Sequence, residues 1–188
     1  MARVPIIEPS DIDNPEMAGI FAWVIDMEGS IPNHFKVELN FPEFFIAKLS
    51  ATKILWETGE LSISEIQKIG ILVSQANGCA YCTAAFCTIW NFGLGATRKE
   101  IEALLSQGSG YCESARESVM LNYALKVNTD ATSITDNDID QLRDAGFGDK
   151  GIVQITHLVS DFASYNRLNL ALDTEYDYDI LWKTLGGF

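Results

Sequence analysis

Two cysteines separated by two residues, Cys79 and Cys82, are the side chains of this sequence best suited to chemistry. They follow Asn77-Gly78, a pair that breaks helices, so the C-x-x-C is expected at the start of a new helix. A spacing of three places both sulfurs on one helix face, within reach of a disulfide. The unpaired N–H groups and the positive dipole end of a first turn favour the thiolate, which is the nucleophile. The pattern predicts reduction of a peroxide or a disulfide by cycling between dithiol and disulfide.

Two other uses of the C-x-x-C stay open on spacing alone. A zinc site needs a second C-x-x-C or a His pair, and the remaining candidates, Cys87, Cys112, His34 and His157, are isolated. Two buried structural cysteines would have the same spacing, because free cysteine is among the most buried residue types. Cys87 is expected in the core and Cys112 near the surface. Neither a metal nor a cofactor is expected.

The two histidines have different expected surroundings. His157 shares a polar stripe with Gln154 and Asp161 on a predicted helix, which indicates a solvated or ion-paired side chain. A second interpretation makes His157 a substitute base that folding brings to Cys82. His34 follows a Pro-Asn pair and is expected in a loop.

Helical periodicity dominates the elements that must position these side chains. Apolar Ile66, Ile69 and Val73 recur at helical steps, and no stretch alternates with period two for long enough to predict a sheet. N-terminal signals mark the helix starts, namely Asn14-Pro15-Glu16, Phe41-Pro42-Glu43, Ser62-Ile63-Ser64-Glu65 and Thr97-Arg98-Lys99-Glu100. The helix opened at Phe41 is expected to end near Trp56, and further helices are expected at about 98–106, 114–127, 136–144 and 149–171. No linker or change of composition divides the chain, so residues 1–188 are expected to form a single all-α domain.

The charge balance excludes several classes of protein. The chain of 188 residues has 13 Lys and Arg against 26 Asp and Glu, a net charge of −13 and a pI near 4.4. Such an acidic surface repels phosphate backbones, so neither nucleic acid nor an anionic membrane is an expected partner. No stretch approaches the ~18 apolar residues of a membrane helix, and the N-terminus lacks the apolar run of a secretory signal. With only four cysteines, a cytoplasmic protein with reduced thiols is expected.

The C-terminal segment 173–188 concentrates negative charge between Asp173 and Asp179, which is typical of a solvated tail. Trp182 and Leu185 lie beyond it and suggest that the tail docks, for example on a neighbouring subunit. A dense aromatic group in the N-terminal half, Phe41, Phe44, Phe45 and Trp56, fits a core or a subunit contact. We therefore expect a homo-oligomer.

The segment from Leu61 through Asn77-Gly78-Cys79-Ala80-Tyr81-Cys82 to Gly93-Leu94-Gly95 resembles the core of the alkylhydroperoxidase D (AhpD) and carboxymuconolactone decarboxylase family. The stretches 134–147 and 162–167 are similar to its peroxidase-related branch, so the resemblance covers roughly residues 40 to 175. It implies an AhpD-like helical bundle that assembles into oligomers. It also implies a thiol peroxidase in which Cys82 attacks the hydroperoxide, Cys79 closes the disulfide, and a thiol serves as electron donor.

Two positions depart from the family pattern. The resemblance implies a proton relay with Glu twelve residues before the first cysteine and His four residues after the second, where this chain has Gln67 and Phe86. Glu65 lies two residues from Gln67, which turns it by about 200° to the opposite helix face. The helix terminus alone is then expected to lower the pKa of Cys82 only partly, which is too little to outweigh deep burial beside Phe86.

Three functions remain open at this point. The first is a thiol peroxidase or disulfide oxidoreductase that acts on a hydroperoxide, with weak activity because the relay is missing. The second is a catalytically degenerate helical oligomer that binds a small ligand or serves as a structural protein. The third is a decarboxylation or lactone reaction, which would need a general base in the pocket.

Overall fold

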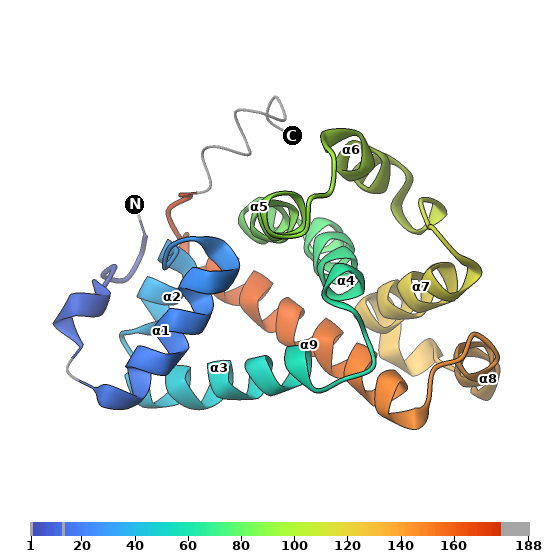
Figure 1. The fold of residues 1–188 in the computed structure, drawn as a ribbon, viewed down its shortest axis with the longest axis horizontal. Coiled ribbons are helices and arrows are strands. Elements are labelled where there is room, and N and C mark those ends of the chain that lie inside the picture. The colour runs from blue at the N-terminus through green and yellow to red at the C-terminus, as the bar shows by residue number, and fades with distance from the viewer. Residues whose placement is uncertain (1, 13, 178–188) are drawn as a thin grey trace.

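The start signals of the sequence lie where helices begin in the computed structural model, which describes residues 2–12 and 14–177. Within these ranges all regular structure is helical, as the sequence predicts (Figure 1). The main helices are α1 (Pro15–Glu28), α2 (Asn33–Glu38), α3 (Pro42–Glu57), α4 (Ile63–Ala76), α5 (Ala80–Thr88), α6 (Arg98–Gln107), α7 (Ala115–Asp130), α8 (Asp136–Asp144) and α9 (Asp149–Leu172). A π-helical turn, Ile89–Gly93, continues α5.

Side-chain caps explain why these helices start where they do. The Asn14 side chain accepts a hydrogen bond from the Glu16 N–H at the start of α1. Ser62 with Glu65, and Thr97 with Glu100, form capping boxes at α4 and α6, so both motif predictions are confirmed.

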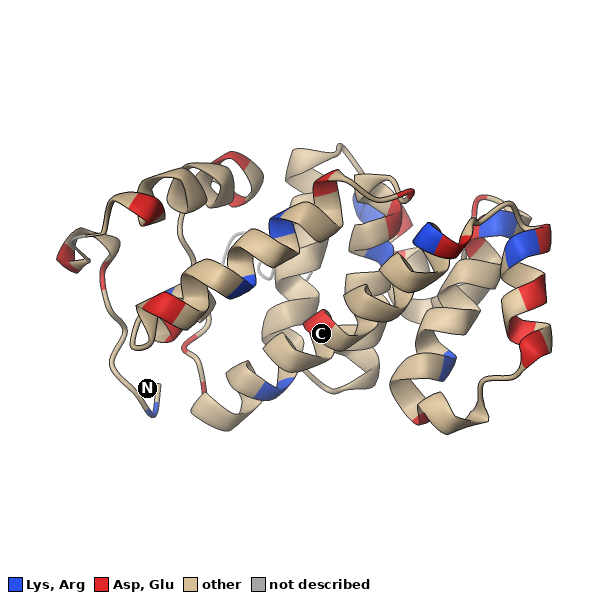
Figure 2. Ribbon diagram, turned by 90° about the horizontal axis from the view of Figure 1, so that it is seen from below, with Lys and Arg blue, Asp and Glu red and all other residues tan. Residues whose placement is uncertain are grey.

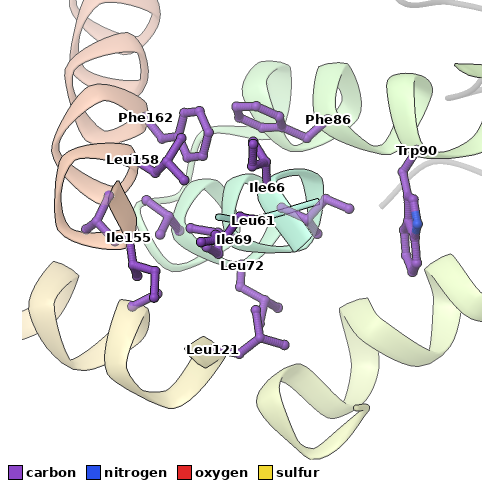
Figure 3. Close-up of a cluster of buried hydrophobic side chains, with 14 of the residues drawn as sticks. Leu61, Ile66, Ile69, Leu72, Phe86, Trp90, Leu121, Ile155, Leu158 and Phe162 are labelled. Atoms are coloured by element: carbon purple, nitrogen blue, oxygen red, sulfur yellow. The ribbon is translucent and has the colours of Figure 1, made fainter. Parts of the chain in front are cut away.

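Helix α4 lies at the centre of the main core, with α5, α6, α7 and α9 packed around it (Figure 1). Ile66 and Ile69 of α4 are completely buried. Figure 3 shows them between Phe86 of α5, Phe162 of α9 and Leu121 of α7. Burial of each such side chain contributes ~1.5–3 kcal/mol, so the C-x-x-C at the start of α5 rests on a rigid base.

Helices α1, α2 and α3 form a second layer over the C-terminal half of α9 (Figure 1). The expected loop at His34 is wrong, because Asn33–Glu38 is the short helix α2. Its Phe35 packs edge-on against Phe45 of α3 and Tyr165 of α9, with ring centroids 5.7 and 6.1 Å apart. A helix of six residues has little stability of its own, so this packing decides its structure.

The residues after α9, Thr174 to Asp177, run back over the first turns of α2 and α5, and we call them the 174–177 segment. The Asp177 carboxylate accepts hydrogen bonds from the Tyr81 hydroxyl (2.5 Å) and from the Asn33 N–H (2.8 Å). The Tyr176 ring packs edge-on against that of Tyr81 at 5.8 Å. This part of the tail therefore docks on its own chain. Trp182 and Leu185 lie outside the described residues, and a contact of the tail with a neighbouring subunit stays a prediction.

Many Lys and Arg positions of the described structure lie near Asp and Glu positions along the ribbon (Figure 2). The ion pairs include Lys126 with Asp138, Arg98 with Glu102, Arg116 with Glu65, and Lys68 with Glu117. None of the helices in the described ranges is long and apolar enough to cross a membrane.

Candidate active site around the Cys79 and Cys82 thiols

The two cysteines of the motif lie at the start of α5, as the sequence predicts. Cys79 is the N-cap residue and Cys82 lies in the first turn, with the two unbonded sulfurs 2.7 Å apart. Only 1% of Cys79 and 4% of Cys82 is exposed. The Cys82 N–H donates to the Cys79 sulfur at 3.3 Å. The pair is thus placed to share one proton and to close a disulfide with little movement of the chain.

The helix break before Cys79 is held by a buried polar network. Gly78 has a φ of 70°, the left-handed conformation that glycine adopts readily. The Asn77 side chain donates to Asn166 Oδ1 at 2.8 Å, and Asn166 in turn donates to Ser74 Oγ at 2.9 Å. Helix α9 therefore fixes the position of the turn from which the dithiol starts.

The environment separates the pKa values of the two thiols. The pKa of Cys79 is lowered, because the Cys82 thiol and the Cys82 N–H donate hydrogen bonds to its sulfur. The pKa of Cys82 is raised, because the hydrogen bond to Cys79 holds its proton and burial disfavours its thiolate. Asn169 Nδ2 donates to the Cys82 sulfur at 3.2 Å and opposes this rise in part. The expectation that burial outweighs the helix terminus at Cys82 agrees with this rise, and Cys79 is the thiol that ionises first.

The two sulfurs face different spaces. Cys82 lines an internal cavity enclosed by α1, α2, α3, α5 and α9. Cys79 lines two outer grooves instead. One groove runs along α6, past Glu102 and Ser106, and the other runs under Thr174 and Tyr176. A molecule that reaches Cys79 from outside therefore occupies a different place from one that reaches Cys82.

The internal cavity has a volume of about 50 Å³ and is almost entirely apolar. A cavity of roughly 150 Å³ holds a benzene molecule, so this one fits only a few heavy atoms unless side chains move. Its walls are mainly aromatic, from Trp23, Phe35, Trp56, Phe86, Phe162 and Tyr165.

Three buried polar atoms in the cavity walls have no hydrogen-bond partner within the described part of the chain: His34 Nε2, Trp56 Nε1 and the Tyr165 hydroxyl. Glu28 lines the cavity as well, with Oε1 3.9 Å from His34 Nε2. The sequence analysis missed His34 because packing brings it to Cys82 from a distant segment. The alternation of Phe35, Val37 and Leu39, all buried, was the one local sign that this segment lies inside.

The two relay positions hold a glutamine and a phenylalanine, whose side chains do not transfer protons. Gln67 is completely buried, and its amide atoms have no hydrogen-bond partner among the described residues. Phe86 packs on Phe162, with ring centroids 4.5 Å apart (Figure 3), and lies flat over Gly70, where a Cβ would come within 2.6 Å of its ring. Glu65 caps α4 and pairs with Arg116 at 3.3 Å, so it does face away, as its position in the helix predicts.

The remaining candidates lie away from this cavity. Cys87 is buried in the core, and burial raises its pKa to about 12, whereas Cys112 is exposed. His157 is exposed in a separate groove beside Asp161, so the structure does not bring it to Cys82. Within the described residues, no three His, Cys, Asp or Glu side chains gather where they would hold a metal ion.

Comparison with known proteins supports the interpretation of the fold. Residues 42–126 match the model of the carboxymuconolactone decarboxylase family. An alkylhydroperoxidase AhpD core, a peroxidase-related protein from Ralstonia eutropha JMP134, has a TM-score of 0.83 at 22% identity, over 96% of this chain and 95% of that chain. A peroxidase-related protein from Silicibacter sp. TM1040 has a TM-score of 0.79 at 25% identity, over 94% and 91%. The expected AhpD-like fold is confirmed.

A third similar structure is that of the debrominase Bmp8, with a TM-score of 0.81 at 18% identity, over 97% of both chains. A cysteine-to-alanine variant of Bmp8 is also known in complex with 2,3,4-tribromopyrrole. No curated protein matches the chain.

Proposed function

Because this chain belongs to the carboxymuconolactone decarboxylase family through residues 42–126, we propose that it is a thiol-dependent reductase whose Cys79–Cys82 dithiol reduces a small, largely apolar hydroperoxide. One observation carries the proposal. Two unbonded sulfurs lie 2.7 Å apart, and one of them faces an enclosed apolar cavity.

The reaction starts at Cys82, the sulfur inside the cavity. Its sulfur attacks the terminal oxygen of the hydroperoxide, the O–O bond breaks, and the alkoxide takes up a proton and leaves as an alcohol. Cys82 becomes a sulfenic acid. Cys79, which holds the proton that Cys82 gives up on attack, then attacks the Cys82 sulfur. The disulfide forms, and the hydroxyl group leaves with that proton as water. Two thiols and one hydroperoxide thus give one disulfide, one alcohol and one water.

Turnover needs a thiol donor that reduces the disulfide. Such a donor reaches Cys79 through the outer grooves and attacks its sulfur, which forms a mixed disulfide with Cys79 and releases Cys82 as a thiolate that takes up a proton. A second donor thiol then attacks the donor sulfur of the mixed disulfide and releases Cys79.

A brominated aromatic ring is the second candidate substrate, and the aromatic cavity wall favours it. Bmp8, which shares the fold, is a debrominase. In that reaction Cys82 would take bromine from the ring, Cys79 would displace bromide, and the ring would gain a proton. The volume of about 50 Å³ favours the hydroperoxide, since the bulkier brominated ring requires a larger movement of the walls.

The test is thiol mapping after a single turnover. We expect tert-butyl hydroperoxide to oxidise Cys79 and Cys82 to a disulfide while Cys87 and Cys112 stay reduced. Cys79→Ser should react more slowly, because it lacks the sulfur that accepts the Cys82 proton, and should stop at a sulfenic acid on Cys82, which dimedone traps. Cys82→Ser should not react.

Three results would contradict the proposal. Trapping of the sulfenic acid on Cys79 would place the attack on the outer sulfur. Oxidation of the dithiol by 2,3,4-tribromopyrrole, together with no reaction with hydroperoxides, would favour the brominated ring as the substrate. A dithiol that reacts with neither reagent faster than the exposed Cys112 would identify a catalytically degenerate protein.

A further inference from the structure

We propose that His34 of α2 is the proton donor to the leaving oxygen in the Cys82 cavity, held by Glu28, in place of the relay that Gln67 and Phe86 no longer provide. This inference rests on the proposed function and adds a residue that the C-x-x-C and its family pattern do not contain.

Attack on a hydroperoxide needs two proton movements at Cys82. The thiol must lose its proton, and the alkoxide that leaves must gain one. The Cys79 sulfur, 2.7 Å from the Cys82 sulfur, accepts the proton that the thiol loses. The second needs a donor inside the cavity, and Cys79 faces the outer grooves.

Among the partnerless polar atoms of the cavity wall, His34 Nε2 is the one suited to transfer a proton. The indole N–H of Trp56 is a hydrogen-bond donor only. Burial raises the pKa of Tyr165 well above its usual value, so its hydroxyl keeps its proton. An imidazole both gains and releases a proton in the neutral range.

The contacts of His34 hold the ring at the cavity wall. Its backbone N–H donates to the Tyr81 hydroxyl at 3.0 Å, and Tyr81 is the chain neighbour of Cys82. Its ring packs against Phe35 with centroids 3.8 Å apart, and edge-on against Tyr165 at 5.9 Å. The residue is 8% exposed. A phenyl ring would make the same packing contacts without burying a partnerless nitrogen, so packing alone does not explain a histidine here.

Glu28 supplies the charge that a protonated His34 needs. Its Oε1 lies 3.9 Å from His34 Nε2, and its side chain is 8% exposed. Glu28 thus lies within ion-pair distance of the ring nitrogen. In the proposed step His34 gives the Nε2 proton to the alkoxide as the O–O bond breaks, and the neutral imidazole then takes up a proton again from solvent, so the atoms and charges balance.

The test compares two oxidants that differ in their leaving group. tert-Butyl hydroperoxide releases an alkoxide, which needs a proton, whereas peracetic acid releases acetate, which does not. If His34 donates the proton, His34→Phe should slow oxidation of the dithiol by tert-butyl hydroperoxide about 100-fold or more, in the range of general acid catalysis. The rate with peracetic acid should change by less than about 5-fold, because no general acid is needed there.

The matched control is His157→Phe, the same substitution at the exposed histidine outside the cavity, which should alter neither rate. His34→Gln repeats the test with a polar side chain that does not transfer a proton, in case the phenyl variant does not fold. An equal loss with both oxidants in a folded variant, or no loss with either, would overturn the role of His34 while the proposed function stands. A wild-type dithiol that neither oxidant attacks would overturn the proposed function, and the inference with it.

Discussion

Restoring the missing relay tests whether residues 67 and 86 occupy relay positions in this fold. The variant is Gln67→Glu with Phe86→His. Gly70 of α4 lies directly against the Phe86 ring, and Gln67 precedes it by one helical turn on the same face. A carboxylate at 67 and an imidazole at 86 should therefore interact across the α4–α5 contact.

The structure sets the expected size of each effect on the free energy of unfolding. Phe86→His alone loses the ring pair with Phe162, ~0.5–1.5 kcal/mol, and places a polar ring in the core. Gln67→Glu alone places a carboxylate at a completely buried position without a partner, which costs about 3 kcal/mol or more. The double variant pairs the two new groups, so its loss should fall short of the sum of the single losses by about 1 kcal/mol or more.

The assay is urea denaturation of the wild type, both single variants and the double variant, followed by oxidation with tert-butyl hydroperoxide at pH 7. We expect the double variant to oxidise faster than the wild type, whereas Phe86→His alone should gain little because its ring lacks an orienting carboxylate. If the loss of unfolding free energy in the double variant equals the sum of the two single losses to within about 0.5 kcal/mol, the two side chains do not interact. A double variant that folds well and gains no rate would refute the reasoning about the relay.

Three further predictions follow from contacts described above. Cys82→Ala removes the thiol that chiefly lowers the pKa of Cys79, so the pH profile of Cys79 alkylation should shift to higher pH; an unshifted profile would contradict the shared proton. Tyr81→Phe removes the hydroxyl that joins Asp177 to α2, which should lower the free energy of unfolding by about 1–3 kcal/mol and speed proteolysis near residue 177; an unchanged digestion pattern would count against this docking. The protein should sediment as a homo-oligomer, and Phe44→Glu on the exposed face of α3 should yield monomers; a wild-type monomer at micromolar concentration would disprove the assembly.

The sequence predicts the helix starts that are determined by residues close together in the chain. Ser62 with Glu65, and Thr97 with Glu100, are complete capping signals within four residues of chain, and both helices start there. The Asn77-Gly78 break likewise placed the dithiol at the start of α5. In each case the residues that decide the structure are neighbours in sequence.

The cavity beyond Cys82 depends on contacts between distant segments. His34 reaches it because Phe35 packs on α3 and α9, and no pattern near residue 34 encodes that contact. The order of the two pKa values also depends on which sulfur accepts hydrogen bonds from the Cys82 N–H and from the other thiol. Side-chain orientation decides this, and the spacing of the two cysteines does not encode it.

The docking of the 174–177 segment has a consequence for the newly made chain. Tyr81 and Asp177 are 96 residues apart, so at about 5–20 residues per second a ribosome needs roughly 5–20 s to travel from one to the other. Until then α9 and the 174–177 segment do not yet cover the start of α5. The two thiols therefore emerge without the walls that later enclose them, so Cys79 and Cys82 of the nascent chain are open to oxidation until α9 and the 174–177 segment have docked.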